Sequence, residues 1–151
     1  MEIKKALKII KKYEGFSPKP YFCPAGVLTI GYGHTGDDVR LGMTITKKQA
    51  TELLKKDLIS FKKNVLKYDE TYHWNKNQYQ ALLSFAYNIG SIDQLTDYGR
   101  RSIGEIEKAI PKYIKANGVI LEGLVKRRNE ELKLFRKEVK YDWLGKGKKR
   151  M

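Results

Sequence analysis

The chain has few of the residues that build covalent or metal-stabilised frameworks. Cys23 is the only cysteine among 151 residues, so no intramolecular disulfide can form. The chain has one cysteine and two histidines, His34 and His73, which stand far apart and do not have the spacing of metal ligands. We therefore expect neither a metal site nor a cofactor. Apolar runs are too short to span a membrane, and lysines interrupt the N-terminal segment too often for a signal peptide.

Negative charge is also scarce. The chain has 31 Lys and Arg residues against 17 Asp and Glu residues, which gives a net charge of +14. Such a field favours polyanionic partners, namely nucleic acid, anionic lipid or an anionic cell-wall polymer. The lysines are dispersed, as on an ordinary solvated surface, and do not cluster on one recognition element. We therefore expect no nucleic-acid partner.

The length predicts one domain over residues 1–151, and the pattern predicts an α+β fold that is mainly helical. Apolar residues at helical spacing predict a first helix over 3–14, with Gly15 as its stop. The capping box of Thr46 and Gln49 opens a long connecting helix. The expected parts are a small antiparallel sheet lobe at about 15–45, the connecting helix at about 46–67, a helical lobe at about 74–139 with helices near 74–90, 103–116 and 122–139, and a basic, mobile tail at 140–151.

Residues 14–34 are the most informative segment. Glu14 extends the apolar stripe of the first helix instead of its lysine face, so we expect this carboxyl to be partly desolvated. Desolvation disfavours the charged form and leaves a proton available for general acid catalysis. The sequence Cys23-Pro24-Ala25-Gly26 is typical of a type I turn, and Thr29 lies in the β-type run that follows.

Each of these residues also has an ordinary structural interpretation. A glutamate at a helix end is usually a solvated charge, and a lone cysteine is most often a small buried apolar residue. A thiol is mostly neutral unless its surroundings lower its pKa. Thr29 suits a strand by propensity alone. Together, an acid, a second polar group and a hydroxyl in one short stretch form a plausible site for cleaving a glycosidic bond.

The spacing adds a family resemblance. Glu14, eight residues, Cys23, five residues and Thr29 resemble the pattern of the phage-type muramidases, the endolysins of glycoside hydrolase family 24. Residues 29–34, 77–90 and 123–135 resemble the segment after the catalytic turn, the central helix and the C-terminal helix of that family. The resemblance covers nearly the whole chain and is weak at 91–118.

The resemblance implies a role for each candidate residue. Glu14 would be the proton donor, and Thr29 would orient the attacking water. Cys23 stands where the family has aspartate or cysteine, and it would be a base, a nucleophile or a water-positioning group. Thr35 and Tyr87 match positions that line the sugar-binding groove, although a loop role and a core role explain them equally well.

One structural pair is also expected. Asp57 falls on the apolar stripe of the connecting helix and needs a partner if it is buried. Because the matching positions pair in the family, the resemblance predicts contact between His34 and Asp57.

The resemblance further implies a lysozyme-like fold with the active site in a cleft between the two lobes. The expected activity is hydrolysis of the β-1,4 bond between N-acetylmuramic acid and N-acetylglucosamine in bacterial peptidoglycan, which lyses the host cell. The expected state is a monomer that acts on peptidoglycan glycan strands. It would stay in the host cytoplasm until a separate holin-type membrane protein releases it to the cell wall and periplasm. The alternatives are a basic nucleic-acid-binding domain and a muramidase-like protein that binds the wall without cutting it.

Overall fold

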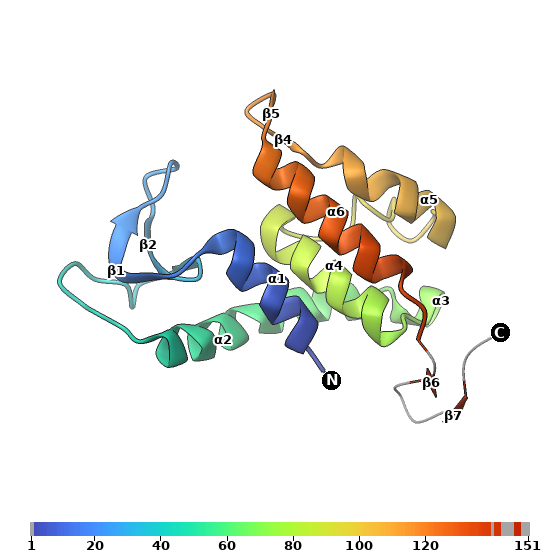
Figure 1. Ribbon diagram of the computed structural model, residues 1–151, viewed down its shortest axis with the longest axis horizontal. Coiled ribbons are helices and arrows are strands. Elements are labelled where there is room, and N and C mark those ends of the chain that lie inside the picture. The colour runs from blue at the N-terminus through green and yellow to red at the C-terminus, as the bar shows by residue number, and fades with distance from the viewer. Residues whose placement is uncertain (1, 140, 143–146, 149–151) are drawn as a thin grey trace. The chain divides into compact units, whose positions relative to one another are not determined.

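The computed structural model describes residues 2–139, 141–142 and 147–148, and over these residues the chain is mainly helical with three small antiparallel sheets (Figure 1). This confirms the predicted α+β class. The chain divides into two compact units. Unit 1 comprises Met1–Ile9 and Phe61–Met151, and unit 2 comprises Ile10–Ser60. The division falls within two helices, α1 (Lys4–Glu14) and α2 (Lys47–Leu66).

Local signals set the ends of both helices. At the end of α1, the backbone N–H of Gly15 donates to the Lys11 carbonyl at 3.0 Å, and Gly15 has a φ of 73°. Glycine adopts this left-handed backbone without steric cost, so the chain leaves the helix here as predicted. The start of α2 carries the predicted capping box. The Gln49 N–H donates to the Thr46 hydroxyl at 3.1 Å, and the Thr46 N–H donates to the Gln49 side chain at 2.8 Å.

A three-stranded antiparallel sheet lies in unit 2, in the order β1 (Ser17–Phe22), β2 (Leu28–Gly31) and β3 (His34–Thr35). Gly31 allows β2 to approach α2 closely. A Cβ at this position would lie 3.1 Å from the Ala50 Cβ, and the φ of 67° is unfavourable for other residues. The sheet is thereby held against the same helix that carries Asp57.

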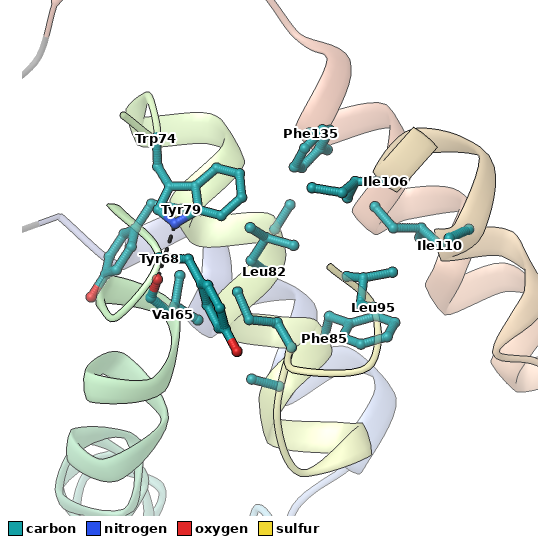
Figure 2. Close-up of a cluster of buried hydrophobic side chains, with 14 residues drawn as sticks. Val65, Tyr68, Trp74, Tyr79, Leu82, Phe85, Leu95, Ile106, Ile110 and Phe135 are labelled. Carbon is teal, nitrogen blue, oxygen red and sulfur yellow. Dashed lines mark hydrogen bonds between the residues drawn. The ribbon is translucent and has the colours of Figure 1, made fainter. Parts of the chain in front are cut away.

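Unit 1 contains the larger hydrophobic core (Figure 2). Within it α4 (Lys76–Ile89) packs beside α6 (Glu122–Arg136), as Figure 1 shows. Trp74 is fully buried, and its indole N–H donates to the Val65 carbonyl at 3.0 Å, the dashed line in Figure 2. This bond satisfies the one polar group that the indole brings into the core. The other elements are α3 (Asp69–Tyr72), α5 (Ile103–Ala109), η1 (Ile110–Lys112), β4 (Lys115–Ala116), β5 (Val119–Ile120), β6 (Tyr141–Asp142) and β7 (Gly147–Lys148).

The predicted helix over 103–116 is wrong in its second half. The α-helix ends at Ala109, and a short 3₁₀ turn containing Pro111 follows it. Proline has no backbone N–H and clashes with the preceding helical turn, which explains the stop. Asn117 and Gly118 both have positive φ, 52° and 77°, and connect the paired strands β4 and β5. Asn-Gly therefore forms a hairpin turn here and does not end a helix.

Two other predictions of extent also need correction. The last helix ends at Arg136 and not at Val139, because Lys137 has extended backbone angles. The short helix α3 was not predicted. In the predicted tail, β6 pairs with β7. Residues 140, 143–146 and 149–151 lie outside the described residues, so the predicted mobility of the tail is not tested. In the described part of the chain, no helix is both long enough and apolar enough to cross a bilayer.

A cluster of buried charges links α4 and α6 in unit 1. Glu131, Arg127 and Arg128 are at most 2% exposed. The Glu131 carboxylate accepts from the Ser84 hydroxyl at 2.6 Å and from the Arg127 Nε at 3.2 Å, and Arg128 Nη1 lies 3.1 Å from its other oxygen. Arg128 also donates to the Asn88 side chain. Burial raises the pKa of Glu131, and the two adjacent guanidinium groups offset part of this shift.

Candidate functional site

The predicted turn at Cys23 forms and places the thiol next to several hydrogen-bond donors. The Gly26 N–H donates to the Cys23 carbonyl at 2.8 Å, which closes the turn, and the Cys23 N–H donates to the Val27 carbonyl at 3.0 Å. Hydrogen bonds to the sulfur, chiefly from the Val27 N–H and then from the Ala25 N–H, lower the pKa of the Cys23 thiol. Donors of this kind stabilise the thiolate, which is the reactive form.

Thr29 adjoins this thiol from the next strand. It is only 4% exposed, and its hydroxyl donates to the Val27 carbonyl at 2.9 Å. When the hydroxyl turns toward Cys23 instead, it can donate to the sulfur, and this contributes to lowering the pKa of the thiol. The structure therefore places Thr29 within hydrogen-bonding reach of Cys23. It does not test whether Thr29 orients a water molecule.

Glu14 is the last residue of α1 and is half-buried, as its position on the apolar stripe predicted. Its charge acts on Tyr21 of β1, and so does that of Cys23. Burial first, and then these two negative charges, raise the pKa of the Tyr21 phenol. Glu14 and Cys23 thus lie around one tyrosine that sequence reasoning did not select. The sequence places Tyr21 two residues before Cys23, and this nearness was the signal that could have pointed to it.

His34 pairs with Asp57 as predicted. Its Nδ1 lies 2.7 Å from the Asp57 carboxylate, which joins β3 to α2. The second ring nitrogen, Nε2, lies 2.9 Å from Asp38, a partner that sequence reasoning missed. A neutral imidazole carries one N–H, so donation to both carboxylates at once requires the protonated ring.

The electrostatics of His34 agree with this geometry. Burial on its own lowers the pKa of His34, but the hydrogen bonds to Asp57 and then Asp38 outweigh burial and raise it. The hydrogen bond from His34 lowers the pKa of Asp38. The missed partner had a local signal, because Asp38 follows His34 by four residues across Gly36, and glycine permits such a tight loop. Gly36 has a φ of 147°, and a Cβ there would lie 2.9 Å from the Asp38 carboxylate.

The two predicted sugar-binding residues belong to different units. Thr35 is exposed on β3 in unit 2, paired across the sheet with Thr29. Tyr87 belongs to α4 in unit 1. Its half-buried ring packs edge-on against the ring of Phe61, with 5.5 Å between the ring centroids. Unit 2 thus contains Glu14, Cys23, Thr29 and Thr35, and the roles of these four residues and of Tyr87 stay predictions.

Comparisons with known proteins give a consistent result. The family described as phage lysozyme matches residues 11–131 of the chain. The endolysin of Bacillus phage PZA is 37% identical over 148 residues, which cover 89% of this chain and 55% of the relative. The endolysin of Acyrthosiphon pisum secondary endosymbiont phage 1 is 35% identical, over 87% of this chain and 94% of the relative.

Solved structures extend the likeness to the fold. The muramidase domain of SpmX from Asticaccaulis excentricus superposes with a TM-score of 0.75 at 30% identity, and covers 90% of this chain and 98% of that chain. The chain spans about half the length of some curated relatives that it matches, 55% for the Bacillus phage PZA endolysin.

Proposed function

Because this chain belongs to the phage lysozyme family, we propose that it is a muramidase that hydrolyses the β-1,4 bond between N-acetylmuramic acid and N-acetylglucosamine in peptidoglycan. The residues 1–151 would act as a single catalytic domain. The family match includes Glu14, Cys23 and Thr29, and the relatives named endolysins support the assignment. The net charge of +14 suits an anionic cell wall.

The observation that carries this proposal is the Cys23 turn. Backbone N–H groups and Thr29 lower the pKa of the Cys23 thiol, which favours the thiolate, the form that can accept a proton. In the proposed reaction, Glu14 gives its proton to the leaving glycosidic oxygen as the bond to the anomeric carbon breaks. Water held by Thr29 adds to that carbon and gives a proton to the Cys23 thiolate. Both groups then recover their starting protonation from solvent.

This role for Cys23 predicts the stereochemical outcome. If water attacks the anomeric carbon directly, the configuration inverts in one step. If the sulfur attacks first, a glycosyl thioether forms, water displaces it, and the configuration is retained. We propose the direct attack of water, with Cys23 as the base. Mass spectrometry of trapped enzyme decides the point, because a covalent glycosyl adduct on Cys23 would contradict this choice.

Digestion of purified peptidoglycan tests the function itself. We expect loss of turbidity and new N-acetylmuramic acid at the reducing ends. Glu14→Gln keeps the shape of the side chain but cannot donate a carboxyl proton, so the rate should fall by roughly two to four orders of magnitude. Glu70→Gln, at an exposed position in α3, is the matched control and should keep the wild-type rate. Binding to the wall without cleavage would favour the non-catalytic alternative.

The setting of the enzyme is proposed on the same ground. We infer a monomer that accumulates in the host cytoplasm and reaches the wall through a separate holin-type membrane protein, with Thr35 and Tyr87 contacting the sugar chain. The support is membership of a family whose relatives are named endolysins. Expression in a bacterial host with and without a membrane-permeabilising protein tests the release step. Lysis that does not depend on that protein would contradict it.

A further inference from the structure

Three hydroxyl side chains form a row across the sheet of unit 2. Tyr21 of β1 pairs directly with Thr29 of β2, and Thr29 pairs directly with Thr35 of β3. Directly opposed residues of antiparallel strands point to the same face, with Cβ atoms roughly 4.5–5.5 Å apart. The row therefore runs from the strand before the Cys23 turn to the exposed threonine that we propose as a sugar contact.

The members of this row differ in what they can reach. Thr29 is 4% exposed and already bonded to the Val27 carbonyl, so it has little surface for a large ligand. Tyr21 is 42% exposed, and Thr35 is exposed as well. The two outer members are thus the ones that a bound molecule on this face would touch. Tyr21 in addition presents an aromatic ring, whose apolar surface can pack against the C–H face of a sugar.

Tyr21 is also within electrostatic reach of the proposed reacting groups. After burial, the negative charges at Glu14 and Cys23 are what raise the pKa of its phenol, so these groups share one neighbourhood in unit 2. A phenol whose pKa is above its ordinary value keeps its proton throughout the neutral range. Tyr21 is therefore a permanent, uncharged hydrogen-bond donor, and it does not compete with Glu14 or Cys23 for their protons.

We propose that Tyr21 is a substrate-contacting residue, which donates a hydrogen bond from its hydroxyl to an oxygen of the amino-sugar chain bound over Glu14, Cys23 and Thr29. This inference rests on the proposed muramidase function, and it adds a residue that the family spacing did not select. The ligand class follows from the donors: uncharged hydroxyls in a row suit the uncharged hydroxyl and amide oxygens of a glycan.

The first experiment removes the hydroxyl alone. Tyr21→Phe keeps the ring and should lower kcat/KM on peptidoglycan about three- to tenfold, the size expected for one hydrogen bond. Its melting temperature should stay that of the wild type, because Tyr21 is 42% exposed and the substitution removes only one oxygen atom. Tyr98→Phe, at a 65% exposed tyrosine of unit 1, is the matched control and should leave kcat/KM unchanged. Equal kcat/KM for the two variants would overturn the proposal.

The second experiment measures binding apart from catalysis. In the Glu14→Gln background, purified glycan strands should bind with an affinity that Tyr21→Phe reduces by a similar three- to tenfold. If glycan strands bind equally with and without the hydroxyl, the Tyr21 contact is wrong while the muramidase function stands. If the wild-type protein neither binds nor cleaves the strands, the proposed function fails, and the Tyr21 contact fails with it.

Discussion

Replacing Asp57 by asparagine tests how much the contact with His34 stabilises the protein. The 2.7 Å bond joins two side chains that are 11% and 26% exposed. A hydrogen bond to a charged group contributes about 1.5–3 kcal/mol, and partial exposure lowers this to about 1–2 kcal/mol. For a chain of this size, a loss of 1 kcal/mol in the free energy of unfolding lowers the melting temperature by about 2–4 °C. Asp57→Asn should therefore lower the melting temperature by about 2–8 °C near pH 5.5.

The loss should depend on pH in a defined direction. The pKa of His34 is raised in the folded protein, so its stabilisation is full below the unfolded value of about 6.5 and disappears as pH rises through the folded pKa. The pKa of Asp38 is lowered, so its contribution is present above about 3.9 and is lost as pH falls through its folded pKa. The wild-type advantage should be greatest between about pH 4 and 6.5.

The assay is thermal unfolding followed by circular dichroism across this window and above it. The difference of Asp57→Asn and His34→Asn from the wild type should be largest in the acidic window and smaller at alkaline pH, where the neutral ring donates only one hydrogen bond. Asp38→Asn should cost less, about 0.2–1 kcal/mol, because the Asp38 side chain is 62% exposed. Parallel curves for wild type and His34→Asn would refute the reasoning, since a pH-independent difference cannot come from a titrating pair.

Two further predictions concern the other buried or reactive groups. Cys23→Asp should remain active, because a carboxylate can act on the same water. Cys23→Ser should lose most activity, because a hydroxyl is far harder to deprotonate than a thiol. An unchanged rate per folded Cys23→Ser molecule would contradict a catalytic role. Glu131→Ala should destabilise the protein by about 3–5 kcal/mol in urea unfolding, because Arg127 and Arg128 would stay buried without their carboxylate; a loss below about 1 kcal/mol would argue against this network.

The elements that were predicted well have their causes close by in the sequence. Helix α1 ends before Gly15, whose N–H donates to the carbonyl of Lys11, four residues earlier. Helix α2 begins with the capping box of Thr46 and Gln49, which spans four residues. The Cys23 turn closes over three residues, and the N–H group that chiefly stabilises its thiol comes from Val27, four residues on. Local hydrogen bonds of this kind can be inferred without knowing the rest of the fold.

The error at 103–116 also has a local explanation. Pro111 stops the helix, and Asn117-Gly118 suits the two positive φ values of a tight hairpin. Both signals stand in the sequence, but Asn-Gly also occurs at helix ends. What decides between these uses is whether the flanking residues find a strand partner. Lys115 and Ala116 pair with Ile120 and Val119, so the hairpin forms.

The sequence by itself determined the end of α1, the start of α2, the turn at Cys23 and, through the spacing of Glu14, Cys23 and Thr29, the family. Apart from the contact between His34 and Asp57, only the tertiary structure decided which distant side chains meet. Strand register sets Tyr21 opposite Thr29, and the loop after β3 brings Asp38 to the second nitrogen of His34. The packing of α4 on α6 buries Glu131 between two arginines. A shift of one residue in register would turn Tyr21 to the opposite face of the sheet, and local sequence preferences do not fix that register.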